Sequence, residues 1–180
     1  MKILQKPETL CGKFVNLRLA TQQDAEFMLA LRNNPKKAKC FCHAVLNDIE
    51  RQKTFIRKST ESESEYLLII ENKNHEPIGM TSIYNIEGTS YTGGRWAMQD
   101  GSSAEEMLEA PLLGDGYAFN VLGMEIKKCD VLKTNKKVIR WHKITGHEVV
   151  GEDENEIYFI LKKDIFNSQK EKFFNWVRGE

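Results

Sequence analysis

The segment from residue 135 to residue 147 holds an amide and an imidazole at a spacing that suits acid–base chemistry on a bound ligand. Asn135 is a good N-cap, because its side chain can accept a backbone N–H that the first helical turn leaves unpaired. His142 follows about two helical turns later, so both side chains can face one groove. An imidazole can donate or accept a proton near pH 7. The pattern predicts a helix over 136–145 that ends at Gly146, with His142 either a proton donor or a partly exposed residue without a chemical role.

A second candidate for ligand contact is the small, polar stretch 99–104. Small residues let a phosphate approach the backbone, and serine hydroxyls add hydrogen-bond donors. A helix is predicted soon afterwards, and the start of a helix attracts anions. Glu105 and Glu106 would lie near such an anion, or would complement the helix dipole in the first turn.

Apolar periodicity and turn residues predict the elements that hold these groups. Strands are expected near residues 16–19, 66–71, 78–84, 92–98, 127–132, 147–151 and 156–162, and helices near 25–31, 48–58, 107–122, 136–145 and 170–177. This order predicts an α+β fold in which helices pack on a mostly antiparallel sheet. Its length of 180 residues, without repeats or a linker, predicts a single domain over residues 1–180.

The composition narrows the class of protein. Hydrophobic residues make up 41%, enough for a core, and the 26 basic and 26 acidic residues balance, which gives no reason to expect a nucleic-acid partner. The longest apolar runs are too short to span a bilayer, and the N-terminus lacks an apolar stretch of signal-peptide length. We therefore expect a cytoplasmic protein with no membrane partner.

The cysteines do not predict a metal site. They are Cys11, Cys40, Cys42 and Cys129. No pair has zinc-site or redox-motif spacing, so reduced thiols are expected. In the run Cys40-Phe41-Cys42-His43, two extended cysteines separated by one residue would point to opposite faces.

The segment 135–147 resembles the signature of the GNAT superfamily of acyl-CoA-dependent N-acyltransferases, which is Asn-x-x-Ala-x-x-x-Tyr followed by Gly-Phe. Asn135 and Gly146 match it, whereas Val138, His142 and His147 stand in place of Ala, Tyr and Phe. The order of elements also resembles the GNAT fold, over roughly residues 14 to 163. The resemblance implies an acyl-CoA co-substrate and no metal.

The resemblance also implies a donor site. In the family, Gln/Arg-x-x-Gly-x-Gly/Ala binds the coenzyme A pyrophosphate, and Gln99 and Ala104 fit this pattern with Ser102 in place of Gly. The register is open, because Tyr117-Ala118-Phe119-Asn120 would place the loop near residues 103–107. The implied cofactor contacts are Ala97, Met98, Gln99, Ser102, Ser103, Ala104 and Asn135.

The implied catalytic groups are a backbone N–H and His142. A bulge in the preceding strand, which Gly93-Gly94 would permit, aims the N–H of Ala97 or Met98 at the thioester carbonyl. We take the N–H of Met98 as the candidate. His142 would protonate the departing thiolate in place of the family's Tyr.

An acceptor site is implied by Arg32-Asn33-Asn34-Pro35 and the segment 48–55. They resemble a GNAT branch that includes transferases for nucleotide-linked amino sugars and ribosomal-protein N-terminal acetyltransferases. Arg32 could bind a diphosphate bidentately, or it could form a helix-end hydrogen-bond cluster with Asn33. The implied substrate contacts are Arg32, Asn33, His43, Tyr84 and Trp96.

The expected function is transfer of an acetyl, longer or hydroxylated acyl group from acyl-CoA to the amine of a nucleotide-linked amino sugar. One alternative is a peptide or ribosomal-protein N-terminal acetyltransferase, and another is a non-catalytic coenzyme-A-binding relative. Small residues at Gly79, Ser82, Gly93 and Gly94 could leave room for a long acyl chain. The oligomeric state is open, with a homodimer among the alternatives.

Overall fold

A computed structural model describes residues 6, 9–38 and 46–178 of the chain. The strands are β1 (Thr9–Cys11), β2 (Asn16–Leu19), β3 (Tyr66–Glu71), β4 (Pro77–Glu87), β5 (Ser90–Met98), β6 (Ile126–Leu132), β7 (Glu148–Glu152) and β8 (Glu156–Lys162). The helices are the short 3₁₀ helix η1 (Gln22–Asp24), α1 (Ala25–Arg32), α2 (Pro35–Ala38), α3 (Ile49–Glu61), α4 (Ala104–Asn120), α5 (Lys136–Ile144) and α6 (Lys163–Arg178).

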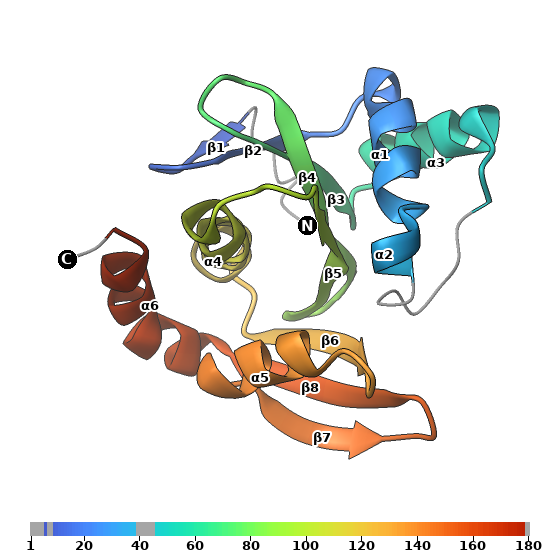
Figure 1. Ribbon diagram of the computed structural model, residues 1–180. Helices are drawn as coiled ribbons and strands as arrows, with labels where there is room; N and C mark the ends of the chain where they lie inside the picture. The colour runs from blue at the N-terminus through green and yellow to red at the C-terminus, as the bar shows by residue number, and fades with distance from the viewer. Residues whose placement is uncertain (1–5, 7–8, 39–45, 179–180) are drawn as a thin grey trace.

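All eight described strands form one sheet in the order β1-β2-β3-β4-β5-β6-β8-β7. Every neighbouring pair is antiparallel except β5 and β6, which run parallel. The sheet bends around α4, and α1 and α3 cover the opposite face of its central strands (Figure 1). The predicted α+β architecture with a mixed, mostly antiparallel sheet is therefore confirmed.

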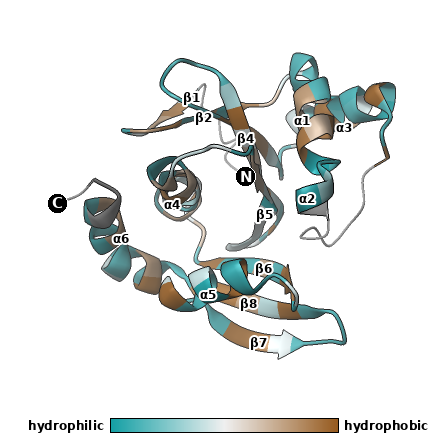
Figure 2. Cartoon of the chain, in the orientation of Figure 1, coloured by the Kyte–Doolittle hydropathy of each residue, from teal (hydrophilic) through white to brown (hydrophobic). Residues whose placement is uncertain are grey.

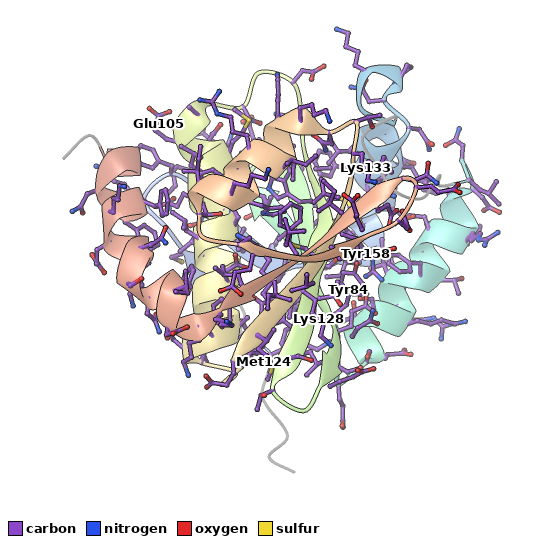
Figure 3. All side chains as sticks on the ribbon, turned by 90° about the horizontal axis from the view of Figure 1, so that it is seen from below. Tyr84, Glu105, Met124, Lys128, Lys133 and Tyr158 are labelled. Atoms are coloured by element: carbon purple, nitrogen blue, oxygen red, sulfur yellow. The ribbon has the colours of Figure 1, made fainter. Side chains whose placement is uncertain are left out.

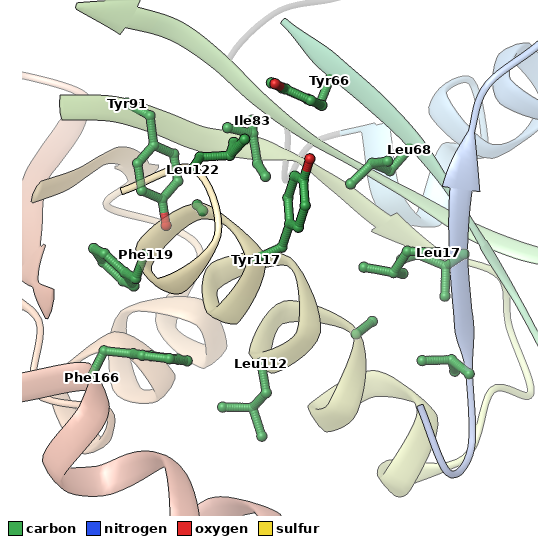
Figure 4. Close-up of a cluster of buried hydrophobic side chains, with 14 of the residues drawn as sticks. Leu17, Tyr66, Leu68, Ile83, Tyr91, Leu112, Tyr117, Phe119, Leu122 and Phe166 are labelled. Atoms are coloured by element: carbon green, nitrogen blue, oxygen red, sulfur yellow. The ribbon is translucent and has the colours of Figure 1, made fainter. Parts of the chain in front are cut away.

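The main core lies between the concave face of the sheet and α4. Tyr66 of β3 meets Tyr117 of α4 edge to face, with ring centroids 5.8 Å apart, and Tyr91 of β5 meets Phe119 in the same way at 5.6 Å (Figure 4). A second cluster lies between the sheet and the pair α1 and α3. Hydrophobic and hydrophilic residues mix along α3 and α6, as expected for helices with one buried side (Figure 2). Two packed layers thus hold the central strands from both sides.

The predicted elements are confirmed, and two of their boundaries were wrong. Helix α4 starts at Ala104 instead of residue 107 and continues through Pro111, because burial against the sheet outweighs the low helix propensity of proline. Helix α6 starts at Lys163, directly after β8, instead of residue 170. Among the described residues, no helix is long and apolar enough to cross a membrane.

A buried carboxylate joins α4 to the chain between β1 and β2. Glu109 is 1% exposed, and its two oxygens accept backbone N–H groups from Lys13, Phe14 and Val15 at 2.9, 2.6 and 2.9 Å. Hydrogen bonds to an ionised acceptor are the stronger kind, and buried backbone donors left unpaired are costly. Glu109 therefore fixes the edge of the sheet against α4.

We predict that Glu109→Gln lowers the free energy of unfolding by about 2 kcal/mol, because an amide NH₂ would replace one of the accepting oxygens. Urea unfolding followed by circular dichroism measures the change. Glu105→Gln, a less buried position on the same helix, should change the stability by less than about 0.5 kcal/mol. Equal effects of the two variants would contradict the role given to Glu109.

Candidate active site

The two parallel strands β5 and β6 pair over only three positions. These are Ser90 with Ile126, Tyr91 with Lys127, and Thr92 with Lys128. Strand β5 continues to Met98 and β6 to Leu132, but no further pairing joins them. The strands therefore separate towards their carboxyl ends.

A β-bulge in β5 accompanies the separation. Met80 of β4 pairs with Ala97, whereas Ser82 pairs with Gly94, so that Thr81 alone opposes two residues of β5. One of these two, Arg95, has φ of 52°, in the left-handed region that few side chains adopt. A bulge bends its strand and increases the local twist. The bulge expected near Gly93-Gly94 is confirmed, at Arg95 and Trp96.

The backbone alternation at the end of β5 distinguishes the two candidate N–H groups. Gln99 donates its N–H to the carbonyl of Ile78 at 2.7 Å, so it points to β4. Successive N–H groups of a strand point to opposite edges. The N–H of Met98 therefore points to the edge that faces β6, and that of Ala97 points to β4.

The loop after β5 leads directly into the N-terminus of α4. Ser103 is the N-cap of this helix, and its hydroxyl accepts the N–H of Glu106 at 3.2 Å. The carboxylate of Glu106 in turn accepts the N–H of Ser103 at 2.8 Å. Gly101 has φ of 92°, which permits the turn before the cap. Residues 99–103 thus form the loop itself, and Ala104 opens the helix.

The small residues around β5 are sites of close approach. A Cβ on Gly79 would lie 2.4 Å from the sulfur of Met98, and one on Gly93 would lie 2.5 Å from Cε of Lys127. A Cβ on Gly94 would lie 3.0 Å from the hydroxyl of Tyr84. The space that the glycines provide is already filled by neighbouring side chains. These contacts do not test whether Gly79, Ser82, Gly93 and Gly94 leave room for a long acyl chain, which stays a prediction.

A buried polar network lies beneath the point where the strands separate. Lys127 forms an ion pair with Asp115 of α4 at 2.7 Å, and Asp115 also accepts the hydroxyl of Tyr91 at 3.0 Å. Burial acts to lower the pKa of Lys127, but the charge of Asp115, with a contribution from Cys129, outweighs it and raises this pKa. Tyr91 and Lys127 are also paired across β5 and β6. The network therefore ties the last paired positions of the two strands to α4.

His142 is buried under α5 instead of being exposed at its surface. It is 8% exposed, its Nε2 lies 3.6 Å from Sγ of Cys129, and its ring lies beside that of His147 with centroids 4.2 Å apart. Burial, and then the charge of Lys127, lower the pKa of His142 to about 3. The imidazolium form is thus disfavoured at neutral pH. The general-acid role of His142 stays a hypothesis that its surroundings do not support.

Asn135 caps α5 as predicted. Its side-chain oxygen accepts the N–H of Val138 at 3.4 Å. The helix ends at Ile144 with Thr145 as its C-cap, and Gly146 follows with φ of 80°, in the left-handed region expected of a glycine that ends a helix.

The acceptor-side candidates lie on both faces of the sheet. Tyr84 pairs with Thr92, which pairs with Lys128, so these three positions share the face opposite α4 (Figure 3). Trp96 packs against the core around α4 instead, so the structure does not bring it beside Tyr84. Arg32 and Asn33 lie at the end of α1, where Asn33 is the C-cap. His43 lies outside the described residues.

Sequence reasoning missed Arg95, the most prominent cation on this face. Its guanidinium lies over the rings of Tyr84 and Phe55, 4.1 and 5.1 Å from their centroids, and it forms an ion pair with Glu65. Two aromatic faces and one carboxylate hold the charge in place. Only the adjacent glycine pair, which favoured a bulge, could have drawn attention to this position.

Comparisons with known proteins agree with this geometry. FdhC, a nucleotide-linked sugar GNAT of known structure, is 30% identical, with a TM-score of 0.82 over 92% of this chain and 96% of its own. Acetyltransferase PseH of Campylobacter jejuni is 25% identical over 152 residues, 84% of this chain and 94% of PseH. A spermidine N-acetyltransferase from Vibrio cholerae, in complex with coenzyme A and spermine, is 14% identical with a TM-score of 0.76, over 85% of this chain and 98% of its own. No family model matches the chain.

The separated strands, the bulge and the relatives together define an acyl-transferring enzyme. The chain belongs to the GNAT superfamily, the GCN5-related N-acetyltransferases.

We predict that Asp115→Asn destabilises the protein by about 3–5 kcal/mol, because it leaves the charge of Lys127 buried without its partner. Urea unfolding measures the loss. Asp115→Leu combined with Lys127→Met removes both charges and should recover most of it. Lys128→Met, a change at the adjacent exposed position, serves as the control and should have little effect. A single variant as stable as the parent would contradict the role of the ion pair.

Proposed function

We propose that this chain transfers an acetyl group from acetyl-CoA to the amine of a nucleotide-linked amino sugar. The observation that carries the acceptor class is the likeness to FdhC, a nucleotide-linked sugar GNAT, over nearly the whole of both chains. The likeness to PseH supports the same class of reaction.

In this proposal the donor lies between the separated ends of β5 and β6. The pyrophosphate of coenzyme A would meet Gln99, Ser102, Ser103 and the backbone at Ala104, where the helix dipole of α4 favours negative charge. The pantetheine arm would run along the backbone of Ala97 and Met98. Asn135 would contribute from the start of α5.

In this proposal, the N–H of Met98 stabilises the negative charge that develops during acyl transfer. The neutral amine attacks the thioester carbonyl, a C–N bond forms, and the N–H of Met98 donates to the oxyanion. The C–S bond then breaks, coenzyme A leaves as a thiolate, and the amine releases a proton to solvent. A thiolate is a good leaving group, since thiols ionise with a pKa of about 8.5. The step therefore does not require an imidazolium at His142.

The acceptor would bind on the face opposite α4. Arg95 could pair with a phosphate of the nucleotide in a charge-assisted hydrogen bond, and Lys128 could add a second positive charge. The ring of Tyr84, 4.1 Å from the guanidinium of Arg95, could stack on the base or sugar. Arg32 and Asn33 remain proposed contacts from the end of α1.

An acceptor panel tests the proposal. The purified chain would be given acetyl-CoA with nucleotide-linked amino sugars, the corresponding free amino sugars, a peptide with an N-terminal alanine, or spermidine. We expect thiol release and a one-acetyl mass gain for a nucleotide-linked sugar, with kcat/KM roughly 10–100 times that of the free sugar. A preference for the peptide or the polyamine would replace this acceptor class. No release with any acceptor, and no thermal shift with acetyl-CoA, would contradict acyl transfer itself.

The variant Arg95→Gln tests the proposed contact between Arg95 and the nucleotide of the acceptor. It should lower kcat/KM for the nucleotide-linked sugar roughly tenfold or more and leave KM for acetyl-CoA unchanged. Arg57→Gln, an exposed change on α3, is the control. An equal loss with the free sugar would show that Arg95 acts through the fold instead of the nucleotide.

Glu106 gives a separate prediction for the donor site. Its carboxylate occupies the helix start where the pyrophosphate is proposed, so Glu106→Gln should tighten coenzyme A binding by about 1 kcal/mol, or roughly fivefold. Calorimetry at low and high salt measures this, and the gain should shrink as salt screens the charge. Weaker binding by the variant would mean that the capping hydrogen bond of Glu106 matters more than its charge.

A further inference from the structure

Three buried side chains gather beneath α5, and two of them occupy the positions where the sequence departs from the GNAT signature. They are Cys129 of β6, His142 of α5 and His147, just before β7, and they are 4, 8 and 7% exposed. Each offers one ligating atom, and these atoms all lie within 4.8 Å of one another. A thiol and two imidazoles are the ligand types that zinc prefers in proteins.

The separation between the ligating atoms of Cys129 and His142 matches tetrahedral coordination. With a metal–sulfur bond of about 2.3 Å and a metal–nitrogen bond of about 2.05 Å, sulfur and nitrogen lie about 3.6 Å apart around a tetrahedral ion. Sγ of Cys129 and Nε2 of His142 are 3.6 Å apart. That distance also suits a weak thiol–imidazole hydrogen bond, but such a bond does not account for His147.

The hydrogen bonds of His147 leave an acceptor nitrogen buried. Its Nδ1 lies 3.0 Å from the hydroxyl of Thr145, which itself donates to the carbonyl of Trp141 at 2.9 Å. Since the hydroxyl proton is used there, Nδ1 of His147 is the donor and Nε2 carries the lone pair. Nε2 of His147 is buried with no hydrogen-bond partner among the described residues. A histidine whose outer N–H donates to an oxygen while its other nitrogen is unpaired has the arrangement of a metal ligand.

The charges around the group permit a bound dication. The charge of Lys127 acts on both imidazoles, but its ion pair with Asp115 offsets it, and Asp130 adds a negative charge that acts on Cys129. On binding, the S–H bond of Cys129 breaks, a metal–sulfur bond forms and one proton is released to solvent.

We propose that Cys129, His142 and His147 bind one divalent transition-metal ion of the zinc class. The ion would join β6, α5 and the start of β7, and so would fix α5 on the outer strands of the sheet. The twelve residues between Cys129 and His142, and the four between His142 and His147, fall within ranges known from zinc sites that hold a helix. This site is independent of the acyl-transfer proposal.

The test uses a protein in which Cys129 is the sole thiol. The triple variant Cys11→Ser, Cys40→Ser, Cys42→Ser leaves the proposed ligands unchanged, and it would be stripped with a chelator and titrated with Co²⁺ and Zn²⁺. We expect one equivalent to bind, with a thiolate-to-cobalt charge-transfer band and the visible bands of a tetrahedral site. At a free zinc concentration of 100 times Kd, Tm should rise by roughly 5–10 °C.

Variants then assign the imidazoles. His142→Tyr and His147→Phe restore the residue types of the GNAT signature and keep an aromatic ring in each place. Each should weaken Co²⁺ binding by more than the roughly 10–100-fold that loss of an outer partner costs. His75→Ala, at an exposed histidine, should leave the affinity unchanged.

Three results would overturn the site. They are the absence of stoichiometric metal in the triple variant, cobalt binding without the charge-transfer band, and affinity that survives His147→Phe. The first two need no change at a ligand, so they decide the question even if a histidine variant fails to fold. Both are measured without substrate, so they leave the acyl-transfer proposal untouched.

Discussion

The pairing of β5 with β6 stops after Thr92, and the geometry of the site depends on that limit. Two parallel strands that stayed paired to their ends would use the N–H of Met98 in the sheet. The bulge at Arg95 and Trp96 turns the end of β5 instead, and the hydrogen bond from Gln99 to β4 means that the N–H of Met98 points to the edge that faces β6. The same strand then delivers the chain to the N-terminus of α4, where a helix start favours an anion. One backbone irregularity would thus set both the proposed oxyanion donor and the proposed phosphate-binding loop.

Side chains of helix α4 hold this irregular region in place. Glu109 ties one part of the helix to the chain before β2, and Asp115 ties the next turns to Lys127 at the last paired positions of β5 and β6. Glu109 is buried and the side chain of Asp115 is 13% exposed, and the partners of both carboxylates would be left unsatisfied without them. The aliphatic and aromatic core between the concave face of the sheet and α4 adds hydrophobic stabilisation, which is not directional (Figure 4). The separated ends of β5 and β6 are therefore supported by directional polar contacts and by apolar packing.

Much of this arrangement could be predicted from the sequence, because it depends on patterns among residues that are close together in the chain. Periodicity gave the strands and helices, and Asn135 and Gly146 marked the ends of α5 through their capping preferences. Arg95 could not be predicted, because its placement between Tyr84 and Phe55 depends on a bulge and on a helix more than 30 residues away. Sequence spacing predicts which face of the helix carries His142, but it does not predict which residues pack against that face. His142 was therefore expected to be accessible. Its contact with Cys129 depends on how α5 packs on the sheet.

The central claim is that acetyl-CoA binds between the ends of β5 and β6 with its carbonyl at the N–H of Met98. A structure of the complex with a non-hydrolysable acetyl-CoA analogue tests it most directly. The account predicts the carbonyl oxygen about 2.9 Å from the nitrogen of Met98, with the pyrophosphate at residues 99–104. An acyl end bound outside the space between β5 and β6, or a carbonyl paired with another donor, would contradict it.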